Sequence, residues 1–215
     1  MIRAIVLDFD GLILDTETAL IAAYGDVHVA HGRPFDRSGL LRAVGHSELA
    51  FDPWHAFGPA ADREALEAER RVRNQVRDLE LAVLPGVVAL LDEALRLGLH
   101  VGLASNSSRA HCTRHLARLG LLERFGFLAC NGETPLPKPA PDLYRRVLEH
   151  FRLRGIEAIA FEDSHTGSLA AKRANLWCVA VPGPTTADHD FRHVDRQVAS
   201  LADCRLADLM TEFSP

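Results

Sequence analysis

The stretch that decides the fold is Ala4-Ile5-Val6-Leu7-Asp8-Phe9-Asp10-Gly11, near the start of a chain of 215 residues. Its apolar run predicts a buried β-strand near residues 3–8. In an extended chain, side chains two residues apart point to the same side, so the carboxylates of Asp8 and Asp10 are expected to lie together. Gly11 allows the backbone to turn away sharply after them. This strand therefore delivers two acids to its carboxyl end.

Outward from this strand, short apolar runs alternate with helical patterns. We expect further strands near residues 99–104, 126–130, 157–162 and 176–181, with helices between most of them. The clearest helical pattern opens at Pro85 and stops at Gly98, as helices that start with proline and end at glycine do. This order of elements predicts an α/β fold with a parallel sheet.

A second helix is expected over about residues 108–119. His111 and His115 lie four residues apart on it, a spacing that can place two ligands on one metal. No third ligand is close in sequence, so we interpret both histidines as residues of the wetter helix face.

The alternation is interrupted from about Glu17 to Glu80, where some sixty residues of helical pattern replace the expected βα unit. We interpret residues 17–80 as an inserted helical module and residues 1–16 and 81–215 as the core that contains the sheet. Within the insert, the segment from Asp62 to Glu80 is dense in Arg and Glu, which is typical of the solvated face of a long helix.

Composition and charge exclude several classes of function. Hydrophobic residues make up 47% of the chain, enough for a packed core, and the formal net charge is -5. No basic stretch could follow a phosphate backbone, so we expect no nucleic-acid partner. The apolar run Ile5-Val6-Leu7 is too short for a signal peptide or a membrane span, so we expect a cytoplasmic protein without a membrane partner. Without a coiled-coil pattern or an apolar surface stripe, a monomer is expected.

Acidic residues follow two of the predicted strands. In open parallel sheets, ligands bind outside the carboxyl ends of the strands. Asp8 and Asp10 follow the first strand, and Glu162 and Asp163 end the fourth. Carboxylates this close need a cation or a shared proton to coexist, and hard oxygen ligands suit Mg²⁺. A calcium loop or plain solvated acids at a strand end are alternative interpretations of the first pair.

Two further segments are suited to a phosphate group. The run Ser105-Asn106-Ser107-Ser108 leads into a helix and offers hydroxyls and free backbone N–H groups to an anion, although simple helix capping would use the same residues. Lys138 lies between Pro137 and Pro139, which fix the backbone around it. Such a lysine can neutralise a phosphoryl group, but an ordinary exposed lysine remains the alternative.

These four segments together resemble the haloacid dehalogenase superfamily of phosphotransferases, in the subgroup whose helical cap follows the first strand. The resemblance spans nearly the whole chain, and the four segments occur in the order and spacing of the family. It implies a Rossmann-like, doubly wound parallel sheet as the core, with an inserted α-helical cap. Because dehalogenases of this group lack the second acid, Asp10 favours phosphate chemistry over dehalogenation.

The resemblance also implies catalytic and metal-binding roles. Asp8 would attack phosphorus and become an aspartyl phosphate, while Asp10 would protonate the leaving oxygen and later activate water. Mg²⁺ would be bound by Asp8, the Asp10 backbone carbonyl and Asp163. Glu162 would be either a further ligand or a residue that orients the ligands.

The phosphoryl oxygens would be bound by Ser105, the backbone of Asn106 and Lys138, and Lys138 would also take part in catalysis. Because phosphoryl transfer depends mainly on positioning and charge stabilisation, each contact would contribute about 2–4 kcal/mol in the transition state. The expected function is a magnesium-dependent phosphatase that hydrolyses a small phosphorylated metabolite.

Two other functions remain open. A sugar-phosphate mutase resembling β-phosphoglucomutase would share these motifs, but its cap histidine and arginine correspond here to Leu20 and the segment Val44-Gly45-His46-Ser47. A catalytically inactive binding module is the other alternative, although no catalytic acid is missing. Within the cap we expect His46 and Trp54 to influence substrate preference, while Trp54 alone is more typical of a core residue.

Overall fold

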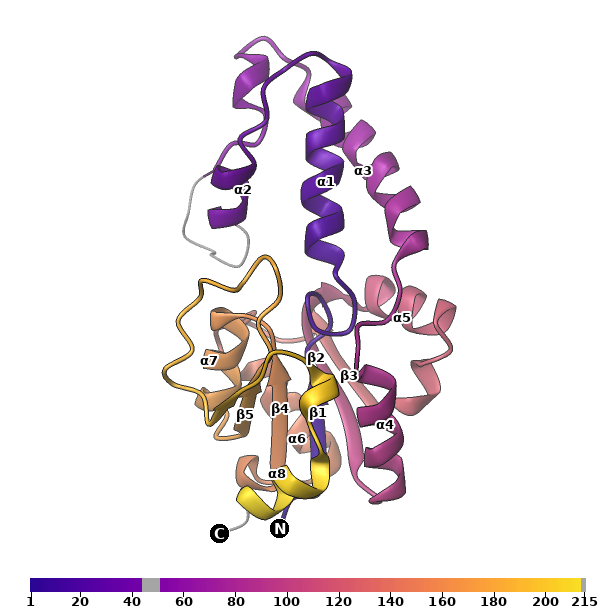
Figure 1. Cartoon of the computed structure of the whole chain (residues 1–215), viewed down its shortest axis with the longest axis vertical. Coiled ribbons are helices and arrows are strands. Elements are labelled where there is room, and N and C mark those ends of the chain that lie inside the picture. Colours follow the sequence, from indigo (N-terminus) through magenta and orange to yellow (C-terminus); the bar gives the residue numbers. More distant parts are fainter. Residues whose placement is uncertain (44–50, 214–215) are drawn as a thin grey trace. The chain divides into compact units, whose positions relative to one another are not determined.

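The computed structural model describes residues 1–43 and 51–213. The chain forms two compact units, shown in Figure 1. Unit 1 comprises Met1–Leu14 and Ala82–Pro215, and unit 2 comprises Asp15–Leu81. The segment Val44-Gly45-His46-Ser47, and with it the prediction for His46, lies outside the described residues.

Unit 1 is built on a parallel sheet that, in the described residues, has six strands in the order β3-β2-β1-β4-β5-β6. The strands are β1 (Ala4–Leu7), β2 (His100–Ser108), β3 (Phe127–Asn131), β4 (Ala158–Glu162), β5 (Trp177–Ala180) and β6 (Arg196–Gln197). Four of the first five lie where the sequence predicts them, while β2 starts where predicted but runs four residues further, through the predicted phosphate segment to Ser108. The two-residue β6 was not predicted, because two residues are too few to show an alternating pattern.

Helices cover both faces of this sheet, which confirms the α/β, Rossmann-like prediction (Figure 1). On one face, Ala4 and Val6 of β1 pack in a buried cluster with apolar residues of α6 and α7. Ile5 and Leu7 alternate with them and are also fully buried, as expected for a strand covered on both sides. The helices of unit 1 are α4 (Val87–Arg96), α5 (Arg109–Arg118), α6 (Asp142–Phe151), α7 (His165–Arg173) and α8 (Leu206–Glu212), with short 3₁₀ turns η2 (Leu122–Arg124), η3 (Gly155–Glu157) and η4 (Leu201–Asp203).

Helix α4 begins two residues later than Pro85 because Gly86 takes a left-handed conformation before it, with φ of 87°. A Cβ at Gly86 would lie 2.2 Å or less from the backbone of Leu201 and Ala202. Only glycine tolerates both this φ and this approach, so Gly86 fixes where α4 starts and where η4 packs.

Helix α5 corrects one prediction from the sequence. His115, interpreted as a residue of the wetter face, is 2% exposed, and its ring lies 4.7 Å from that of His111 between centroids. His111 itself is only partly exposed. The apolar pattern of α5 is short, so the sequence could not reveal that its buried stripe includes a histidine.

Unit 2 consists of α1 (Thr16–Ala30), α2 (Arg37–Ala43), the 3₁₀ turn η1 (His55–Phe57) and α3 (Arg63–Glu80). Asp15 and Asp62 cap α1 and α3, accepting hydrogen bonds from Thr18 N (3.1 Å) and Ala65 N (3.0 Å). Each such cap stabilises its helix by about 1 kcal/mol. An ion pair between Arg77 and Asp26 joins the two long helices, but at this exposure it adds little stability.

The apolar core of unit 2 is small and centres on Val27, Trp54 and Leu66. Trp54 is 5% exposed, and its indole stacks on the ring of His28 with centroids 5.5 Å apart. Its place in this core agrees with the interpretation of Trp54 as a core residue.

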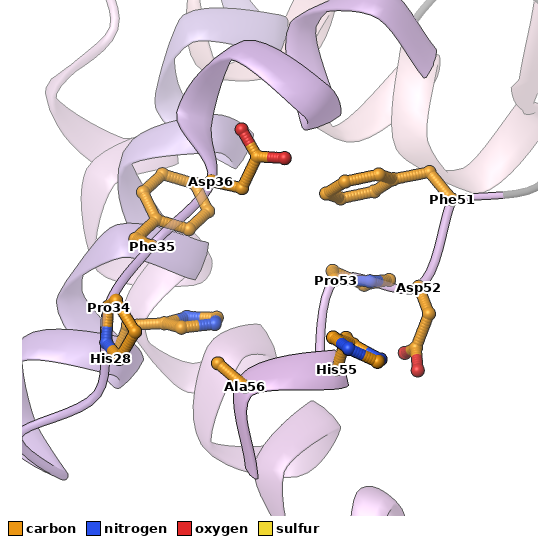
Figure 2. A pocket seen from close by; sticks show the side chains of 9 residues that line it. All are labelled: His28, Pro34, Phe35, Asp36, Phe51, Asp52, Pro53, His55 and Ala56. Atoms are coloured by element: carbon orange, nitrogen blue, oxygen red, sulfur yellow. The ribbon is translucent and has the colours of Figure 1, made fainter. Parts of the chain in front are cut away.

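Beside this core lies a cavity of about 450 Å³, shown in Figure 2. The buried His28 projects into it from α1 and is held there by a contact of 2.8 Å between its Nδ1 and the Tyr24 carbonyl. The cavity is lined by His28, Pro34, Phe35, Asp36, Phe51, Asp52, Pro53, His55 and Ala56. Its lining combines aromatic and proline rings with the carboxylates of Asp36 and Asp52, so it offers both apolar and acidic surface.

Among the helices that the structure describes, none combines the length and the apolar composition that a membrane crossing requires.

Replacing Trp54 with alanine should lower the free energy of unfolding by about 3–5 kcal/mol, because a large buried ring is lost from a small core. The exposed Val72 on α3 provides a control, and Val72→Ala should change stability by less than about 0.5 kcal/mol. Urea unfolding of both variants is monitored by circular dichroism, a signal that does not depend on the tryptophan. Equal, small effects would show that Trp54 is not part of the core.

Candidate active site

The site forms where β1 and β4 end side by side. Leu7 pairs with Phe161 in the sheet, and the Asp8 N–H donates to the Phe161 carbonyl at 3.0 Å. Asp8 follows Leu7 and Glu162 follows Phe161, so the two acids lie side by side where β1 and β4 end. The main-chain pairing of β1 with β4 brings the two acids together, not any attraction between the acids themselves.

Lys138 lies between these two acids. Its Nζ is 2.5 Å from Asp8 Oδ1 and 2.5 Å from Glu162 Oε1, and all three side chains are buried. The lysine reaches this point from the loop that links β3 to α6. Buried charges are tolerated only when they are paired in this way.

Asn106 holds the loop that carries Lys138. Its side chain accepts from the Lys138 N–H (2.8 Å) and donates to the Lys138 carbonyl (3.3 Å). The pairing of β2 with β3 is irregular between Ser105 and Ser108, so the residues between them leave the regular ladder. The sequence suggested a role for the Asn106 backbone but not this clamp by its side chain.

Asp163 adds a third carboxylate to the cluster. One carboxylate oxygen from each of Asp8, Glu162 and Asp163 lies within 4.8 Å of the other two. A Cβ built on Gly11 would lie 2.2 Å from Asp163 Oδ2, so the glycine of the first motif makes room for this acid. The site thus depends on Gly11 both for its turn, with φ of 81°, and for this close approach.

The charges in the cluster are not balanced by Lys138 alone. Burial raises the pKa of Asp8 well above its ordinary value, the charges of Glu162 and Asp10 raise it further, and Lys138 opposes them. Burial by itself would lower the pKa of Lys138, but the adjacent Asp8 and Glu162 outweigh it and raise this pKa. The lysine therefore stays charged between the two acids.

A divalent metal ion fits this donor set. Three carboxylates, each with an oxygen within 4.8 Å of the other two, form the arrangement of hard oxygens that Mg²⁺ prefers. In addition, Glu162 Oε2 is buried without a hydrogen-bond partner among the residues that the structure describes. A bound cation would neutralise the excess negative charge.

Asp10 contacts residues of β2 and α5. Its Oδ2 is 2.5 Å from Ser107 Oγ and its Oδ1 is 3.1 Å from His111 Nε2. Ser105, predicted to contact phosphate, is 1% exposed, and its Oγ accepts from the Ser107 N–H at 2.9 Å. Within the predicted phosphate segment, Ser107 therefore contacts both Ser105 and Asp10.

Three residues near the site, His111, Tyr144 and Thr186, were not predicted for it, and Ser107 was predicted only as part of the phosphate segment. Ser107 and His111 contact Asp10; the Tyr144 hydroxyl donates to Glu162 Oε1 at 2.5 Å; and the Thr186 hydroxyl lies 3.5 Å from Asp163 Oδ2. Tyr144 and Thr186 lie in a helix and a loop without a motif, so no sequence signal pointed to them. His111 follows the phosphate segment by a few residues, which was a usable signal, and its interpretation as a residue of the wetter helix face missed its contact with Asp10.

Comparison with known proteins agrees with this geometry. Residues 2–175 match the family of haloacid dehalogenase-like hydrolases. YhcW of Bacillus subtilis (strain 168), provisionally named a phosphatase, is 36% identical over 100% of this chain and 99% of its own length. Hexitol phosphatase B of Escherichia coli (strain K12) is 30% identical, with 97% of each chain covered.

A solved structure shares the fold. CbbY from Rhodobacter sphaeroides, crystallised as a mutant with xylulose-(1,5)bisphosphate, is 25% identical with a TM-score of 0.74. The likeness covers 94% of this chain and 96% of that one.

Replacing Lys138 with methionine should lower the free energy of unfolding by about 3–5 kcal/mol, because two buried carboxylates then face each other without a cation. Lys172→Met is the matched control, since its ion pair with Asp195 is partly exposed and should contribute about 1 kcal/mol or less. Urea unfolding at pH 7 without added metal compares them. Similar losses in the two variants would contradict the special position of Lys138.

Proposed function

The chain belongs to the haloacid dehalogenase-like hydrolases and is a phosphatase, and we propose that it hydrolyses a small phosphorylated metabolite with Mg²⁺ through a phosphate ester on Asp8. The observation that supports this most directly is the buried cluster of Asp8, Glu162 and Asp163 around Lys138. A nucleophilic carboxylate beside a fixed lysine and an excess of metal-binding oxygens is what phosphoryl transfer requires.

Asp8 attacks phosphorus in this proposal. A carboxylate oxygen of Asp8 forms a bond to phosphorus as the bond to the leaving oxygen breaks, and Asp10 gives that oxygen a proton. In the second half, Asp10 takes a proton from a water molecule, which attacks phosphorus and releases phosphate and free Asp8. Asp10 ends the cycle protonated again, so the proton balance closes.

Lys138 and the phosphate segment stabilise the transferring group. Lys138 contacts Asp8 directly, so its ammonium group lies beside any phosphoryl oxygen bound there. Ser105 and the Asn106 backbone supply hydrogen bonds from the neighbouring strand. Fixed donors of this kind need no reorganisation when charge develops, and each contributes about 2–4 kcal/mol.

The metal would be held by Asp8, Asp163 and the Asp10 backbone carbonyl. Glu162 either binds it or orients the others through its contacts with Lys138 and Tyr144. When bound, Mg²⁺ would screen the negative charge that otherwise keeps an anionic nucleophile from an anionic phosphate.

The substrate in this proposal is a phosphorylated sugar or polyol. The names of two relatives support this class: one is a hexitol phosphatase, and another was crystallised with a sugar bisphosphate. Unit 2, inserted directly after the nucleophile strand, acts as the cap that selects the substrate. A cytoplasmic location and a monomeric state remain predictions from the sequence.

Substituting Asp8 with asparagine should reduce turnover at least about 1,000-fold, since the amide keeps the side-chain volume but cannot act as the nucleophile. Release of phosphate from a panel of sugar and polyol phosphates with MgCl₂ is the measurement. Wild-type rates in Asp8→Asn would refute the mechanism. Conversion of β-glucose 1-phosphate to glucose 6-phosphate without phosphate release would identify a mutase instead.

The two acids proposed near the metal should differ in their effect on metal affinity. Asp163→Asn removes a side-chain ligand, while Asp10→Asn leaves the backbone carbonyl in place, so Asp163→Asn should raise the Mg²⁺ dissociation constant about tenfold or more relative to Asp10→Asn. Isothermal titration calorimetry measures both constants. Equal losses of affinity would contradict this division between side chain and backbone.

A further inference from the structure

The carboxylate of Asp10 is held on both oxygens by neighbours from β2 and α5. Ser107 Oγ lies 2.5 Å from Oδ2, and His111 Nε2 lies 3.1 Å from Oδ1. When Asp10 is ionised, its carboxylate can only accept hydrogen bonds, so the serine hydroxyl and the imidazole N–H then both donate. Two donors on different oxygens fix the rotation of the carboxylate as well as its position.

His111 is itself held in place by three contacts. Its backbone N–H donates to the hydroxyl of Ser108, the residue that caps α5, at 3.3 Å. Its ring meets the ring of Phe9 edge-on, with centroids 5.5 Å apart and planes at 84°. The buried His115 supports the other side at 4.7 Å. All these residues belong to unit 1, so the orientation of His111 is built into the catalytic core.

The need for such a support follows from the exposure of the pair. The side chains of Asp10 and His111 are 23% and 24% exposed, unlike those of the buried Asp8 and Glu162. Water can compete for a partly exposed carboxylate, and an unsupported Asp10 would sample several rotamers. A misplacement of about 1 Å can reduce a rate about 100-fold.

We infer that His111 is a positioning residue for Asp10, which it holds through Nε2 in the orientation used for proton transfer. This inference rests on the role proposed above for Asp10. The contacts of His111 are with Asp10, Ser108 and the rings of Phe9 and His115, so its effect is expected on proton transfer rather than on metal binding.

The test compares p-nitrophenyl phosphate with phenyl phosphate, which have similar shapes but leaving groups of different basicity. The more basic phenolate depends more on protonation by Asp10. In His111→Leu, the ratio of kcat/KM for p-nitrophenyl phosphate to that for phenyl phosphate should rise about tenfold. In His111→Gln, which keeps an N–H donor, the ratio should stay within about threefold of wild type. The parameter kcat/KM reports the steps up to transfer onto Asp8, where the acid acts.

Asp10→Asn, alone and combined with His111→Leu, tests the proton-transfer role of Asp10 separately from the positioning role of His111. Alone it should raise the ratio more than His111→Leu does, and adding His111→Leu should then change the ratio no further, because His111 acts through Asp10. An unchanged ratio in Asp10→Asn would contradict the role of Asp10, and so the proposed function. A raised ratio in Asp10→Asn with no change in His111→Leu, or an equal fall of kcat/KM on both substrates, would overturn the inference about His111.

Discussion

The active site depends on one buried contact, in which Lys138 lies 2.5 Å from both Asp8 and Glu162. The two acids end neighbouring strands at the same register, so the sheet forces them together, and only an intervening cation makes this burial tolerable. The clamp by Asn106, the glycine at position 11 and the hydroxyl of Tyr144 all serve to keep this group in one arrangement. Lys138 carries one positive charge beside three carboxylates, so a metal ion bound there would reduce the remaining negative charge.

The sequence predicts the framework of this site well, because strand ends follow directly from local pattern. Asp8, Glu162 and Asp163 could be placed together once β1 and β4 were recognised as parallel strands. Tyr144 and Thr186 could not, since each reaches the site from an element whose own pattern is ordinary and whose position is fixed only by packing. His115 shows that local pattern also fails to predict burial. It is a polar residue on a short helix, so it was assigned to the surface, but tertiary packing buries it.

The division of the chain into two units suggests a division of labour. All the acids of the cluster, Lys138 and the support of Asp10 belong to unit 1, whose parallel sheet fixes their geometry. Unit 2 contains a small aromatic core and a separate cavity, and its sequence can change without disturbing the strand ends. Sites on a rigid scaffold combined with a variable insert allow one chemistry to serve many substrates.

The central claim, a covalent phosphate on Asp8, can be tested by trapping it. Acid quenching during turnover, followed by borohydride reduction, converts an aspartyl phosphate to homoserine, which mass spectrometry of the peptide containing Asp8 identifies. The account predicts homoserine at position 8 when substrate and Mg²⁺ are both present, and unmodified Asp8 when substrate is omitted. Homoserine at another carboxylate, or none at any position during active turnover, would contradict it.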